Sequence, residues 1–107
     1  MKTATPDTVT LARGQFELIA KALADPRRMA LLESISETRG GECACQRLLS
    51  LFPVTKGTVS HHMKELGRAG LIDAKRDGQF MKYQVRHSVL RAYTLELTRR
   101  MKLDSEA

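Results

Sequence analysis

Residues 44–66 read ACQRLLSLFPVTKGTVSHHMKEL, and this stretch decides the fold. Apolar residues recur in its first half at the spacing of a short helix, which Pro53 ends. Thr55 can then cap a second helix, so that only residues 52–55 connect the two. This is the spacing of a helix-turn-helix, in which the second helix is free to enter a major groove. The inner faces are expected to consist of Ala44, Leu48, Leu51 and Phe52 in the first helix and of Val59, Met63 and Leu66 in the second.

The outer face of the second helix is polar and basic. Its hydroxyl, imidazole and ammonium groups can bond to phosphates or to the edges of bases. Gly57, near the start of this helix, lets the backbone approach DNA closely, and the N–H groups of a helix N-terminus favour a phosphate. The residues expected to contact DNA from this helix are Lys56, Gly57, Thr58, Ser60, His61 and Lys64. His62 lies towards the inner face instead and is expected to be a structural histidine that hydrogen-bonds within the motif.

A β-hairpin is expected directly after these helices. Ile72 lies near the start of its first strand, and Asp77-Gly78, within residues 74–85, is a strong signal for a two-residue turn. Basic side chains near the tip can reach phosphates or an adjacent minor groove. These basic residues are Lys75, Arg76 and Lys82. Residues 56–86 hold seven basic and three acidic side chains, a local +4 within the chain's +6, which together with the helices predicts nucleic-acid binding.

Two more helices are expected before this region and one after it. The first covers about residues 8–24, and the second starts with Asp25 as N-cap and Pro26 at its first position. The second helix has an inner stripe of Met29, Leu32 and Ile35, and the last helix carries Val89, Leu90, Tyr93, Leu97 and Met101. The expected fold is mainly α with a small β-hairpin, a winged helix-turn-helix of order α-α-α-α-β-β-α. It occupies residues 8–102, between flexible ends at 1–7 and 103–107.

Length and composition narrow the possible functions. A chain of 107 residues suits one domain, and a net charge of +6 favours a polyanionic partner. Three phenylalanines and two tyrosines, with no tryptophan, are too few for a surface built on base stacking. No apolar run reaches the roughly 18 residues of a membrane span, and residues 1–7 lack a secretory signal, so a cytoplasmic protein without membrane contact is expected. An enzyme is not expected, because no catalytic triad arrangement, HExxH motif or phosphate-binding glycine loop is present.

Cys43 and Cys45 are separated by a single residue. So close a pair makes a poor structural disulfide, and reduced thiols are expected. Both are expected at the start of a helix, where residues i and i+2 point about 200° apart. Their thiolates, which are soft ligands, can therefore hold one ion only if the first turn unwinds, a change that Gly40-Gly41 just upstream facilitates.

Four ordered segments resemble the ArsR/SmtB family of winged-helix transcriptional repressors. They are KALADPRR at 21–28, TVSHHMKEL at 58–66, AGLI at 69–72 and RDGQ at 76–79. The resemblance covers residues 12–101 and is specific as an ordered set rather than in any one motif. It implies a homodimer that binds double-stranded DNA at an inverted-repeat operator with a recognition helix at about 55–68. It also implies repression that a metal ion or another chemical signal relieves.

Dimerisation also suits the residues themselves, because the first and last helices are apolar on more than one face. Leu90 and Leu97 lie one heptad apart and can seat against a partner. The expected dimer contacts are Leu11, Leu18, Leu90, Tyr93 and Leu97. Some members of the family carry an Asp/His zinc site at the start of the last helix. His87 lies there without a carboxylate two residues before it, so that site is expected to be absent.

Glu42-Cys43-Ala44-Cys45 resembles the family's thiolate sensor motif, which binds arsenite, antimonite or a soft divalent ion. The leading hypothesis is a repressor that needs no cofactor to bind DNA. An inducer of this kind, bound by Cys43 and Cys45, would release the repressor from its operator. The chain departs from the fullest pattern, since Gln46 replaces an acidic residue and no third cysteine follows. Two alternatives stay open, a redox or reactive-sulfur switch and a pair that only packs the motif without metal sensing. A more distant alternative is a winged-helix module for protein–protein interaction.

Overall fold

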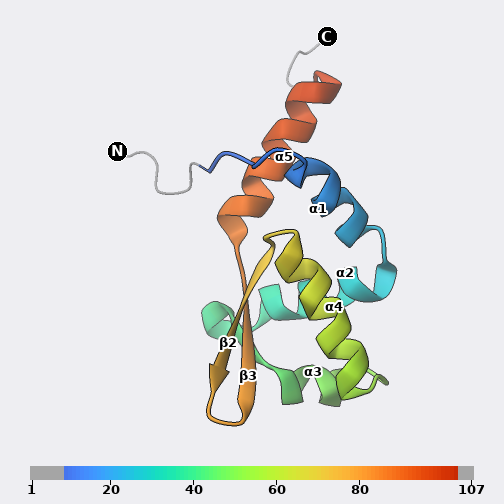
Figure 1. The fold of residues 1–107 in the computed structure, drawn as a ribbon, viewed down its shortest axis with the longest axis vertical. Helices are drawn as coiled ribbons and strands as arrows, with labels where there is room; N and C mark the ends of the chain where they lie inside the picture. Colours follow the sequence, from blue (N-terminus) through green and yellow to red (C-terminus); the bar gives the residue numbers. More distant parts are fainter. Residues whose placement is uncertain (1–8, 104–107) are drawn as a thin grey trace.

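The computed structural model describes residues 9–103 and confirms a winged helix-turn-helix (Figure 1). The predicted flexible ends, 1–7 and 103–107, lie outside the described residues apart from Leu103, which is exposed. In chain order the elements are α1 (Gln15–Leu23), α2 (Pro26–Glu37), the 3-10 turn η1 (Arg39–Gly41), β1 (Glu42–Ala44), α3 (Cys45–Leu51), α4 (Lys56–Arg68), β2 (Ile72–Asp77), β3 (Phe80–Val85) and α5 (His87–Met101). This order adds one short strand, β1, to the predicted series.

The three strands form an antiparallel sheet in the order β1-β3-β2. The wing consists of β2 and β3, and Asp77 pairs with Phe80 across its tip, so the two loop residues are Gly78 and Gln79. The predicted turn centre at Asp77-Gly78 is therefore one residue too early. Gly78 has a φ of +65° at the first loop position, where a type II′ turn requires positive φ.

β1 corrects the expectation that both cysteines lie at the start of a helix. Cys43 is the central residue of this strand and pairs with Tyr83 of β3, whereas α3 begins only at Cys45. Ala44 between them has an extended backbone, with φ −74° and ψ 146°. Residues i and i+2 of an extended segment point to the same side, and both cysteines are buried in the core. No helical turn has to unwind before the two side chains share a face.

The predicted start of α2 is confirmed, whereas the predicted start of α1 is not. α1 begins at Gln15 rather than near residue 8, because Gly14 takes a left-handed φ of +78° that a helix cannot continue through. α2 begins as predicted, with Asp25 as its N-cap. Its Oδ1 accepts hydrogen bonds from the N–H groups of Arg27 at 2.9 Å and Arg28 at 3.2 Å.

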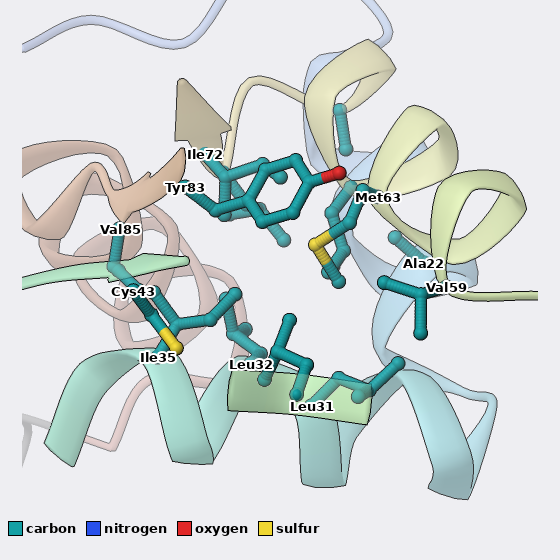
Figure 2. Packing of buried hydrophobic residues seen from close by; sticks show 14 of the residues in the cluster. Ala22, Leu31, Leu32, Ile35, Cys43, Val59, Met63, Ile72, Tyr83 and Val85 are labelled. Atoms are coloured by element: carbon teal, nitrogen blue, oxygen red, sulfur yellow. The ribbon is translucent and has the colours of Figure 1, made fainter. Parts of the chain in front are cut away.

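The core lies where α1, α2 and α4 meet the sheet (Figure 2). The predicted inner face of α4 is confirmed, since all three of its residues are buried. Two other expectations were wrong. Leu51 is 50% exposed, because the buried face of α3 runs through Cys45 and the fully buried Leu48, and Leu51 is rotated away from it. In α2, Leu31 is buried where Met29 was expected, and Met29 is half-buried.

The long axis of the molecule separates two regions (Figure 1). The tip of the wing, α3 and the start of α4 lie at one end, and α1 and α5 lie towards the other. The principal extents are 48 × 31 × 24 Å. The residues predicted to contact DNA and those predicted to form the dimer are therefore well separated within one protomer.

The junction between α4 and β2 is tied to α1 by one side chain. Gln15 Nε2 donates to the carbonyl oxygen of Ala69 at 3.0 Å, and Gln15 Oε1 accepts from the N–H of Ala12 at 2.8 Å. Gly70 has a φ of +83°, and a Cβ at this position would lie 2.6 Å from Gln15 Nε2. Gly70 is therefore required both for its backbone conformation and for the space that it leaves.

Candidate nucleic-acid interface

α4 presents the predicted DNA contacts on the side away from the core. Val59 and Leu66 are fully buried and Met63 is 3% exposed, so packing against the rest of the domain fixes the rotation of this helix. The predicted contacts Lys56, Gly57, Ser60, His61 and Lys64 are exposed, and Thr58 is half-buried. The burial pattern thus leaves an ordered polar surface along the outer face of α4.

The start of α4 is capped as predicted. Thr55 Oγ1 accepts a hydrogen bond from the N–H of Thr58 at 3.1 Å, and the Thr55 hydroxyl donates to Thr58 Oγ1 at 3.0 Å. Positions 56–59 hold no acidic residue, so the positive end of the helix dipole is not neutralised there. The first turn of α4 can therefore accept a phosphate, while the Thr58 hydroxyl is already engaged in the cap.

Pairing within the wing divides its basic side chains between two faces. Lys75 lies directly opposite Lys82, and Arg76 lies opposite Met81. Successive residues of a strand point to opposite faces, so Arg76 is on the face of Tyr83, which is buried, and the two lysines are on the other face. Lys82 also forms an ion pair with Asp77 at 3.3 Å. Period-two alternation could have shown this division in the sequence.

Arg76 shares a cavity with the recognition helix that the sequence did not indicate. This cavity, of about 220 Å³, is bordered by Lys56 and Ser60 of α4 and by Cys45 at the start of α3. Three of the predicted DNA contacts therefore lie around one hollow, whereas Lys75 and Lys82 do not border it. No sequence motif marks this site, because its walls come from segments distant in the chain.

His62 is buried, as expected of a structural histidine, with 7% of its surface exposed. The expected hydrogen bond is not formed at Nδ1, which is buried and has no partner among residues 9–103. Burial lowers the pKa of His62, and the carboxylate of Asp25 opposes this shift. His62 is therefore favoured as a neutral packing residue, while the ring of His61 is on the exposed side.

The two thiols are free and nearly inaccessible. Cys43 is 1% exposed and Cys45 is 6% exposed. The Cys43 thiol contacts the carbonyl oxygen of Ala44 at 3.6 Å. Burial raises the pKa of Tyr83, and the contact of its hydroxyl with Cys45 raises it further. In residues 9–103, no group of three or more His, Cys, Asp or Glu side chains is placed to hold a metal ion.

The predicted dimer residues differ in how much surface they offer. Leu18 is 41% exposed, whereas Leu90 and Tyr93 are half-buried against the core of their own protomer. The rings of Tyr93 and Phe16 are 4.9 Å apart between centroids, which joins α5 to α1. Leu11 precedes α1 rather than lying in it, and it too is half-buried, as is Leu97. Leu95, which the sequence did not single out, is 69% exposed on α5.

Comparison with known proteins places the chain in a family. The helix-turn-helix domain family matches residues 23–73. An arsenical resistance operon repressor from Staphylococcus xylosus is 37% identical over 76 residues, which are 71% of this chain and 70% of the relative. The chain belongs to the ArsR/SmtB family. The relatives are transcriptional regulators and not enzymes.

Solved structures share the fold of this chain. An ArsR-like transcriptional regulator from Rhodococcus sp. RHA1 has the same fold, with a TM-score of 0.72 at 17% identity, over 86% of this chain and 83% of the other. A homodimeric winged helix-turn-helix DNA-binding domain from Mycobacterium bovis has a TM-score of 0.65 at 25% identity, over 88% and 86% of the two chains. None of the helices within residues 9–103 has the length and apolar character needed to cross a membrane.

Proposed function

We propose that this protein is a homodimeric transcriptional repressor that binds double-stranded DNA at an inverted-repeat operator. The observation that carries the proposal is the outer face of α4, which exposes Lys56, Ser60, His61 and Lys64 while the opposite face is locked in the core. The basic wing lies at the same end of the molecule (Figure 1). A helix held in this way can enter a major groove while the wing contacts the flanking backbone. Such a repressor acts in the cytoplasm and needs no cofactor to bind DNA.

The proposed dimer is built on α1 and α5. Leu18 and Leu95 are exposed, as is Met101 at 61%, and exposed apolar groups of this size favour association. Support also comes from the Mycobacterium bovis relative, whose domain is homodimeric. A two-fold axis through this region would place two recognition helices about one turn of DNA apart, roughly 34 Å. Sedimentation at micromolar concentration should show a dimer, and a monomer both with and without DNA would contradict the proposal.

We further propose that Cys43 and Cys45 bind a thiophilic inducer, arsenite or antimonite before zinc or cadmium. Two thiols on one side of an extended segment are suitable soft donors. A third ligand has to come from solvent, because the described residues offer none at this place. Support comes from the Staphylococcus xylosus relative, which is a repressor of an arsenical resistance operon.

The position of the cysteines suggests how they would act on DNA binding. Both thiols are buried and only Cys45 borders the cavity beside α4, so one ion can reach both only if the junction of β1 and α3 opens. Opening separates Cys43 from its partner Tyr83 and moves α3, whose buried Leu48 is part of the same core as α4. Tenfold loss of operator affinity requires about 1.4 kcal/mol of differential binding. That is a small demand on two metal–thiolate bonds.

Serine variants separate this proposal from its alternatives. Arsenite should release wild-type protein from its operator and leave the double variant Cys43→Ser, Cys45→Ser bound. Release of the double variant by arsenite would show that the pair is not the sensor. Release of wild type by peroxide or polysulfide, but not by arsenite, would indicate a redox or reactive-sulfur switch. No response to any of these would leave the cysteines as packing residues.

A further inference from the structure

The cavity between α3, α4 and the wing combines an apolar wall with charged groups. It has a volume of about 220 Å³, below the roughly 300–1,000 Å³ of pockets for drug-sized ligands. Leu49, Phe80 and Met81 form its apolar wall, and Lys56, Ser60 and Arg76 supply polar and charged groups. A few convergent polar groups beside an apolar wall are typical of small-molecule sites.

The charge around this cavity is positive and uncompensated. Lys56 and Arg76 both border it, and no Asp or Glu is among the described residues that line it. Elsewhere on the wing, Lys82 has Asp77 as its ion partner, but within residues 9–103 neither Lys56 nor Arg76 has a carboxylate at ion-pair distance. The start of α4 adds the positive end of its dipole. These groups select an anion over a neutral or cationic ligand.

We propose that this cavity binds a small organic anion with an apolar body about the size of one aromatic ring, an aromatic carboxylate being the simplest example. The carboxylate would pair with Arg76 and Lys56, and the ring would pack against Leu49 and Met81. An inorganic anion would satisfy the charges but leave the apolar wall without a partner.

Occupancy of this site has a direct consequence if the proposed function is correct, and this part of the inference rests on it. Lys56, Ser60 and Arg76 are also proposed DNA contacts, so a ligand that pairs with them competes with phosphates and base edges. The effect needs no opening of the core, in contrast to an inducer at the buried cysteines. The cavity thus provides a second route by which a small molecule releases DNA.

Binding can be measured without DNA, by methyl NMR of the full-length protein during titration with benzoate. The methyl groups of Leu49 and Met81 should shift and saturate, while those of Leu95 and Met101 at the other end of the molecule should not. Acetate carries the charge without the ring, and benzyl alcohol carries the ring without the charge, so both should bind more weakly than benzoate. Equal shifts with acetate, or no saturation with benzoate, would overturn the inference.

Two wing variants form a matched pair for this titration. Arg76→Gln removes a charge at the cavity and should weaken benzoate binding about fivefold, the effect of losing one partly exposed ion pair. Lys75→Gln removes the neighbouring charge from the other face of the wing and should leave benzoate binding unchanged. The same affinity in both variants would overturn the proposed site.

A DNA competition assay completes the test. Benzoate should lower the affinity of wild-type protein for duplex DNA, and Arg76→Gln should need about fivefold more benzoate for the same loss, in proportion to its weaker binding. Saturable benzoate binding with no effect on bound DNA would overturn the competition but keep the site. Failure of the protein to bind any duplex would refute the proposed function, and the methyl shifts would still decide whether the anion site exists.

Discussion

Replacing Gly70 with alanine should destabilise the domain strongly, because two independent costs coincide at this residue. Its φ of +83° is disfavoured by about 1–2 kcal/mol for a residue with a Cβ. The new Cβ would also lie 2.6 Å from Gln15 Nε2, so that this side chain must move. Moving it breaks the bonds to Ala69 and Ala12, each worth about 0.5–1.5 kcal/mol. The free energy of unfolding should therefore fall by about 2–5 kcal/mol.

Two controls distinguish the backbone cost from the lost contacts. Gly67→Ala, in the last turn of α4, meets nothing within 4 Å and has an ordinary φ, so it should raise the free energy of unfolding by about 0.5–1 kcal/mol. In a Gln15→Ala background the steric conflict is absent, and Gly70→Ala should cost only its backbone strain. Urea denaturation at one fixed protein concentration measures wild type and the four variants, since dimer stability depends on concentration. A Gly70→Ala variant within 0.5 kcal/mol of wild type would refute this reasoning.

Three other predictions follow from the site. Lys64→Ala should weaken binding to specific and random duplexes alike in an anisotropy titration, because Lys64 is exposed on α4 and is proposed to contact a phosphate. Ser60→Ala or His61→Ala should lower the preference for the operator by about 1–3 kcal/mol, as expected for residues that read base edges. Because the pKa of His62 is lowered in the folded protein, the unfolded chain binds a proton on this side chain more readily. As the pH is lowered past about 6.5, the free energy of unfolding should therefore decrease by up to about 1.4 kcal/mol per pH unit. His62→Gln should remove this part of the acid sensitivity, and an unchanged pH profile in urea melts would contradict it.

The sequence predicted those parts of the fold that depend on local periodicity. Val59, Met63 and Leu66 repeat at helical spacing, and the structure buries all three. β1 was missed because three residues are too few to show alternation, and the strand exists only through pairing with β3 some forty residues later. The start of α1 was predicted too early because Leu11, on the N-terminal side of Gly14, fits the helical spacing of the apolar residues that follow.

In the candidate site, too, the features set by local sequence could be predicted and those set by tertiary packing could not. The polar face of α4 could be inferred from the residues opposite its apolar face, and family resemblance supported it. The cavity beside Arg76 could not be inferred, because its walls come from α3, α4 and the wing, whose relative placement depends on tertiary packing. Likewise, the shared orientation of Cys43 and Cys45 depends on the pairing with Tyr83 rather than on their own spacing.

The salt dependence of DNA binding tests the central claim most directly. Fluorescence anisotropy would follow the protein on an inverted-repeat operator and on a random duplex of equal length at several salt concentrations. If a dimer neutralises roughly 6–8 phosphates through α4 and the wing, log affinity should fall against log salt with a slope of about −5 to −7. The operator should bind two protomers and bind them more tightly than the random duplex. A flat salt dependence, or the same affinity for both duplexes, would contradict the account and favour a winged-helix module for protein–protein interaction.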